Sequence, residues 1–122
     1  MNSETFGSWL DAYGHAWETR DPEAATRLFT EDATYHETPF DEPARGYAEI
    51  LEYWSEGARS QEDVRFSHEV VAVTENEGIA SWRANFRRVP SGAQVKLDGI
   101  FLVKLNTDGL CTEFREWWHK QE

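Results

Sequence analysis

The chain has 122 residues, 39% of them hydrophobic and 14% aromatic, which is enough for one hydrophobic core and predicts a single domain over residues 1–122. A formal net charge of −11 argues against nucleic acid and anionic membranes as partners and favours a small neutral hydrophobic ligand. One cysteine, no secretion signal and no apolar run near the roughly 18 residues of a membrane span predict a soluble cytoplasmic protein.

The first half of the sequence predicts three helices and one short strand. Large apolar side chains recur every three or four residues over 4–19, which predicts an amphipathic helix with this stripe: Phe6, Trp9, Leu10, Tyr13 and Trp17. Asp21 and Pro22 are typical of a helix start, and this second helix is expected to end near Thr30. A third helix is expected over 47–58, with its apolar stripe formed by Ile50, Leu51, Trp54 and Ala58.

The short strand is predicted at residues 33–37, "ATYHE", between the second and third helices. Its alternation places Tyr35 and Glu37 on one face and His36 on the other. A carboxylate that shares a strand face with an aromatic ring is either a solvated strand-end charge or a desolvated proton acceptor. Desolvation would raise the pKa of Glu37 toward the range useful for a general base.

The second half predicts four strands at 64–75, 79–89, 94–105 and 110–119, separated by the turn signals "ENEG", "PSG" and "NTDG". Alternation puts these residues on shared strand faces: Trp82, Ala84 and Phe86; Val95, Leu97, Gly99, Phe101, Val103 and Leu105; Leu110, Thr112, Phe114, Glu116 and Trp118. Helices followed by a meander predict an α+β fold, with the helices on one face of a mixed or antiparallel sheet.

Several segments together resemble the nuclear transport factor 2-like superfamily, in particular its SnoaL-like and ketosteroid-isomerase-like branch. The resemblance rests on Tyr13 in "LDAYGHAW", on "RDPEAATRLFTEDATYHETPF", on Gly46 in "PARGYAEILEYW" and on "DGLCTEFREWW". It implies a cystatin-like cone, in which a curved sheet wraps around the N-terminal helices and encloses an apolar pocket. It also implies a homodimer formed through the outer face of the sheet.

The resemblance to ketosteroid isomerases implies candidate catalytic residues. Their base maps to Glu37 when "ATYHE" is aligned from Ala33, or to Thr38 when the alignment is anchored on Pro39. Their hydroxyl donor maps to Tyr13. A phenol in an apolar pocket can hydrogen-bond a developing oxyanion, so this position suits the role. The alternative for Tyr13 is a core tyrosine whose hydroxyl reaches the surface.

The third member of the isomerase set, a protonated aspartic acid, maps to Phe101. Loss of one oxyanion donor costs roughly 3 to 4 kcal/mol of transition-state stabilisation, so efficient steroid isomerisation is not expected. Phe101 would instead make the pocket more apolar. The aromatic residues expected to line it, each of which could equally be plain core, are Trp17, Tyr35, Trp54, Trp82, Phe86, Phe101 and Trp118.

No metal and no cofactor are expected, because His36 and Glu37 point to opposite strand faces and no glycine-rich phosphate loop is present. The sequence therefore predicts a protein that binds a small hydrophobic molecule and acts as a cofactor-independent proton-transfer enzyme on a carbonyl compound. An isomerase, a cyclase and a dehydratase all fit this description. The alternative is a non-catalytic ligand-binding protein or a dimeric assembly module of the same fold.

Overall fold

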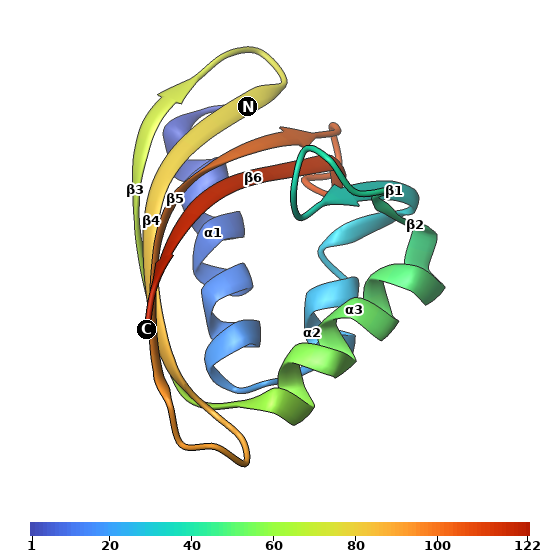
Figure 1. Ribbon diagram of the computed structural model, residues 1–122. Helices are drawn as coiled ribbons and strands as arrows, with labels where there is room; N and C mark the ends of the chain where they lie inside the picture. The colour runs from blue at the N-terminus through green and yellow to red at the C-terminus, as the bar shows by residue number, and fades with distance from the viewer.

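The computed structural model describes all residues from 1 to 122 and shows an α+β fold (Figure 1). The helices are α1 (Ser3–Glu18), α2 (Pro22–Thr26) and α3 (Gly46–Ser60). The strands are β1 (Phe29–His36), β2 (Ala44–Arg45), β3 (Gln61–Val73), β4 (Glu77–Arg88), β5 (Gln94–Leu105) and β6 (Cys111–Gln121). None of the helices has the length and apolar character needed to cross a bilayer.

The six strands form one mixed sheet in the order β2-β1-β6-β5-β4-β3. Strands β3 to β6 make an antiparallel meander, as the turn signals predict, while β1 pairs in parallel with β6. The sheet curves around α1, and α3 closes the opposite side (Figure 1). The concave face therefore surrounds an interior, whereas no other element covers the convex face.

Helix α1 carries most of the helical contribution to the core. Asn2 caps it by accepting a hydrogen bond from the backbone N–H of Thr5 across 2.8 Å, which satisfies a donor that the first turn leaves free. The predicted stripe faces the sheet: Phe6, Trp9, Leu10 and Tyr13 are buried, and Trp17 packs against the edge of the same cluster. The apolar period of this helix thus fixed its orientation.

Several boundaries differ from the sequence prediction, most of all where α2 is followed by β1. Helix α2 ends at Thr26 and β1 begins at Phe29, so the segment expected to continue the helix is extended. Phe29 is fully buried and pairs with Cys111 of β6, which means that tertiary pairing overrides local helix propensity here. Strand β2 is only two residues long and was not predicted.

The alternation expected for β6 is wrong at its start. The pairing of β5 with β6 shifts register between Lys104 and Leu105, so Cys111 is buried whereas Thr112 is exposed. From Phe114 onward the predicted alternation holds, and Phe114 and Glu116 face the interior. A bulge of this kind is not visible in a pattern of single residues, because it depends on the partner strand.

Candidate active site

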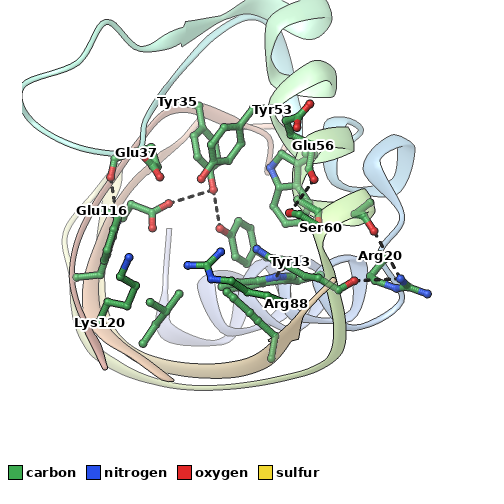
Figure 2. Close-up of a pocket in the computed structure, with 18 residues that line it drawn as sticks. Tyr13, Arg20, Tyr35, Glu37, Tyr53, Glu56, Ser60, Arg88, Glu116 and Lys120 are labelled. Carbon is green, nitrogen blue, oxygen red and sulfur yellow. Dashed lines mark hydrogen bonds between the residues drawn. The ribbon is translucent and has the colours of Figure 1, made fainter. Parts of the chain in front are cut away.

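A pocket of about 430 Å³ opens between α1, α3 and the concave face of the sheet. This volume falls within the range of small-molecule sites. Seven aromatic residues line it: Tyr13, Trp17, Tyr35, Tyr53, Trp54, Phe86 and Trp118. Three acidic side chains, Glu37, Glu56 and Glu116, line the same space (Figure 2). The site thus combines aromatic walls with charged and polar side chains.

Three oxygen-bearing side chains form a continuous hydrogen-bonded chain in this pocket (Figure 2). The hydroxyls of Tyr13 and Tyr35 lie 2.7 Å apart, and the Tyr35 hydroxyl donates to Glu116 Oε2 across 3.1 Å. Phe114 stacks on both tyrosine rings, with centroids 4.4 Å from Tyr35 and 5.3 Å from Tyr13. Helix α1 and strands β1 and β6 each supply one member, so only the folded chain assembles them.

Glu116 is the one buried charged residue of the protein, with 8% of its surface exposed. Burial raises its pKa to about 8, with a smaller effect in the same direction from the nearby charge of Glu37, while the Tyr35 hydrogen bond acts in the opposite direction. Burial likewise raises the pKa of Tyr13 and of Tyr35 well above that of free tyrosine. At neutral pH this chain is therefore made mainly of neutral, proton-bearing groups.

Glu37 follows β1 directly and remains partly accessible. Partial burial and the charge of Asp41 raise its pKa, whereas a hydrogen bond with Tyr53 lowers it. Its backbone carbonyl accepts a hydrogen bond from Trp118 Nε1 across 3.1 Å, which ties this residue to β6. Tyr53 is 37% accessible, yet its surroundings are dense enough that burial raises the pKa of its phenol.

The family model of the SnoaL-like domain matches residues 10–114 of the chain. The protein belongs to the SnoaL-like domain family. A search of curated proteins gave no significant match. The fold agrees with this assignment, because a curved mixed sheet around N-terminal helices is the nuclear transport factor 2-like arrangement.

Solved structures share the fold of this SnoaL-like domain at low sequence identity. The epoxide hydrolase/cyclase-like enzyme SalBIII, which has a role in pyran ring formation in the polyether salinomycin, aligns with a TM-score of 0.84 and 19% identity over 98% of this chain and 95% of its own. A candidate isomerase from Bacillus subtilis aligns with a TM-score of 0.85 and 19% identity, covering 98% of this chain and 90% of that one. RV0760c from Mycobacterium tuberculosis, in complex with estradiol-17beta-hemisuccinate, aligns with a TM-score of 0.80 and 13% identity, covering 93% and 95%.

Five of the seven aromatic residues expected in the pocket of this SnoaL-like domain line it, as does Tyr13, the expected hydroxyl donor: Trp17, Tyr35, Trp54, Phe86 and Trp118. Trp82 and Phe101 do not. They stack on each other with centroids 4.7 Å apart and lie in the core behind the pocket wall. Of the two alignments for the base, the structure places Glu37 at the pocket, while the Thr38 hydroxyl donates to Asp41 instead.

Glu116 and Tyr53 are the residues of the SnoaL-like site that sequence reasoning missed. Glu116 could have been found, because the strand alternation already placed an acidic residue between the inward-facing Phe114 and Trp118. In the observed register, Glu116 is the direct cross-strand partner of Phe101. The carboxyl group absent at position 101 is thus matched by one on the neighbouring strand.

No three His, Cys, Asp or Glu side chains gather closely enough to hold a metal ion.

Proposed function

We propose that this protein is a cofactor-independent enzyme that transfers a proton beside the carbonyl group of a hydrophobic small molecule, as an isomerase, cyclase or dehydratase does. The observation that carries the proposal is the hydrogen-bonded chain Tyr13, Tyr35 and Glu116 with Glu37 on the wall of the same aromatic pocket. Two carboxyl groups in one site, held in different protonation states, are a recurrent basis for acid and base chemistry.

The two carboxyl groups take different roles in this proposal. Glu37 is the base, because it is only partly buried and its pKa is raised less than that of Glu116. It removes a proton from the carbon beside the carbonyl, which leaves an enolate, and it can return the proton to another carbon. In this proposal Glu116 keeps its proton at neutral pH and therefore serves as a hydrogen-bond donor rather than as a base.

The oxyanion is stabilised by the tyrosines. When Glu116 is protonated, the same three oxygens permit hydrogen bonds in the order Glu116 to Tyr35 to Tyr13, which frees the Tyr13 proton for the substrate oxygen. Such preorganised donors stabilise developing charge strongly in a water-poor site. The similarity to SalBIII and to the Bacillus subtilis protein supports a reaction of this class, and the RV0760c complex supports a flat hydrophobic ligand.

Hydrogen–deuterium exchange tests this function without knowledge of the product. In heavy water, the wild-type protein should exchange protons beside the carbonyl of some members of a panel of hydrophobic ketones and enones, as followed by NMR. Replacing Glu37 by glutamine should slow this exchange about a hundredfold to ten-thousandfold, because the amide cannot accept the proton. Glu52→Gln, an equivalent change on an exposed position of α3, is the matched control and should exchange at the wild-type rate.

Two outcomes would count against this assignment. Exchange that is equally fast in wild type and Glu37→Gln would remove Glu37 from the role of base. Absence of exchange above buffer across the panel, with tryptophan fluorescence still responding to the same ligands, would favour a non-catalytic carrier of the same fold.

We also propose that the protein forms a homodimer through the convex face of its sheet. This face carries large apolar side chains that are 36% to 58% exposed: Val71, Ile79, Ile100 and Trp117. Ile100 and Trp117 are cross-strand partners on β5 and β6, so their side chains form a continuous apolar surface. A second copy of the chain packed on this face would remove these apolar side chains from water, which favours association.

Replacing Trp117 by lysine should therefore weaken the dimer by about 2 kcal/mol or more, close to thirtyfold in the dissociation constant. Sedimentation equilibrium measures this change. Phe40→Lys is the control, because Phe40 is 96% exposed but belongs to the loop between β1 and β2. A wild-type protein that remains monomeric at high concentration would contradict the proposal.

A further inference from the structure

Three basic side chains line the pocket in a protein that is otherwise acidic. Arg20, Arg88 and Lys120 all line this pocket, although the whole chain has only 12 basic residues against 23 acidic ones. In Figure 2 the side chains of Arg88 and Lys120 extend toward the same space as Glu116 and Tyr13. Local cations of this kind can attract an anion that the net charge of the protein would repel.

Lys120 lies in line with the proposed catalytic groups. Glu116, Trp118 and Lys120 alternate along β6 and all line the pocket, so they face the same side of the strand. About 13 Å of extended strand separates Glu116 from Lys120 at a rise of about 3.3 Å per residue. Exposure increases in the same direction, from 8% for Glu116 to 39% for the Lys120 side chain. The pocket therefore runs from a buried acidic end to a basic mouth.

Arg88 joins Lys120 at this mouth from the neighbouring end of β4. Its guanidinium lies 5.7 Å from the ring centroid of Phe86, another residue of the pocket wall. Arg20 is held differently, because its Nη1 donates to the backbone carbonyl of Gln61 across 3.0 Å. Arg88 and Lys120 therefore differ from Arg20, because both lie beside a side-chain carboxylate rather than a backbone carbonyl.

These two cations already hold a carboxylate of the chain itself. Glu122 accepts a hydrogen bond from Arg88 Nε at Oε1 across 3.0 Å, while its Oε2 lies 3.7 Å from Lys120 Nζ. The Arg88 and Glu122 side chains are 37% and 48% exposed. Exposed ion pairs of this type contribute little, typically below about 1 kcal/mol, so another carboxylate can replace Glu122.

We propose that the ligand of this pocket carries a carboxylate at the end opposite its carbonyl group, and that Arg88 and Lys120 bind this carboxylate at the mouth. The inference rests on the proposed function for the position of the carbonyl, and it replaces the neutral ligand expected from the overall charge. The arrangement of Glu122 between the two cations is the pattern that the ligand would reproduce. A singly charged carboxylate suits the site better than a phosphate dianion, because the carboxylates Glu37 and Glu56 line the same pocket.

Binding of matched acids and esters tests this subsite directly. The probes are phenyl ketones bearing a terminal carboxylic acid on chains of two, four, six or eight methylene groups, each paired with its methyl ester, and estradiol-17beta-hemisuccinate paired with estradiol. Quenching of tryptophan fluorescence reports binding, because Trp17, Trp54 and Trp118 line the pocket. At low salt the wild type should bind the best acid of the series about threefold to tenfold more tightly than its ester.

Single substitutions assign the preference to the two cations. Arg88→Gln and Lys120→Gln should each abolish most of the preference for the acid and leave the affinity for the ester unchanged. Glu122→Gln should strengthen binding of the acid about twofold to fivefold, because it removes the competing carboxylate. Lys96→Gln is the matched control, since Lys96 lies on the opposite face of the sheet near the same end and should leave the preference intact.

Equal affinity for acid and ester in the wild type, or no detectable binding of any acid, would overturn the proposal. So would a loss of preference in Lys96→Gln as large as in Lys120→Gln, because the effect would then follow from net charge alone. The result is separable from the proposed function. An acid preference that persists in Glu37→Gln, with no proton exchange in the wild type, would support the carboxylate subsite and contradict the proposed enzymatic function.

Discussion

Replacing Glu116 by glutamine should remove a large pH dependence from the stability of this protein. A glutamic acid in the unfolded chain ionises near pH 4.5, whereas burial raises the pKa of Glu116 in the folded protein to about 8. Between these values the folded state holds a proton that the unfolded state has lost. The free energy of unfolding contributed by this group therefore decreases as pH rises, by about 1.4 kcal/mol per pH unit.

The difference between wild type and Glu116→Gln isolates this effect, because most other titrating groups are common to both proteins. Urea unfolding at pH 5, 6, 7 and 8 should show the wild type losing up to about 4 kcal/mol relative to the variant across this range. Below pH 4.5 both states carry the proton, and above pH 8 neither does, so the difference should become constant at each end.

Glu113→Gln provides a control on the same strand. A hydrogen bond from Arg115 across 2.9 Å lowers the pKa of Glu113, so its stabilising effect is complete above pH 5 and is lost only in more acidic solution. The difference between wild type and this variant should be flat from pH 5 to 8. A similarly flat result for Glu116→Gln would mean that Glu116 ionises normally when folded. That result would contradict the proposed role of Glu116 as a protonated hydrogen-bond donor.

Gly99→Ala should destabilise the fold by about 3 kcal/mol or more. Gly99 pairs with Trp82 on β4 and with Trp118 on β6, and the absence of a side chain leaves room for both. A Cβ atom here would overlap the backbone carbonyl oxygen of Trp117 and would lie 3.0 Å from Trp82 Nε1. Overpacking against side chains costs roughly 1 to 3 kcal/mol, and a collision with backbone cannot be relieved by a rotamer change.

The effect of Gly99→Ala should extend to the pocket, because Trp118 lines it and its indole holds the backbone of Glu37. Thermal and urea unfolding measure the stability change.

Gly7→Ala is the control with the opposite expected effect, since Gly7 lies in α1 with nothing within 4 Å of an added Cβ. That substitution should stabilise the protein by about 0.5 to 1 kcal/mol. A Gly99→Ala variant as stable as wild type would show that the sheet can shift there without cost.

The sequence by itself determined the elements whose signals are local. The stripe of α1 from Phe6 to Trp17 has the helical period, and it places Tyr13 against the sheet as predicted. Turn residues separate the strands of the meander, so the antiparallel order followed from the chain alone. Glu37 was selected by the alternation of a single strand together with the resemblance to ketosteroid isomerases, and the structure places it on the pocket wall.

Only the tertiary structure decided how these elements meet. The parallel pairing of β1 with β6 brings Tyr35 within hydrogen-bonding distance of Glu116, a residue 81 positions away, and no local pattern encodes that register. The same register sets Glu116 beside Phe101, so a carboxyl that the sequence alignment counted as missing is present from another strand. Burial then raises its pKa, and burial is a property of the assembled interior rather than of the residue. For the same reason Arg88, Lys120 and Glu122 resemble ordinary surface charges in the sequence until the ends of β4 and β6 come together at the mouth of the pocket.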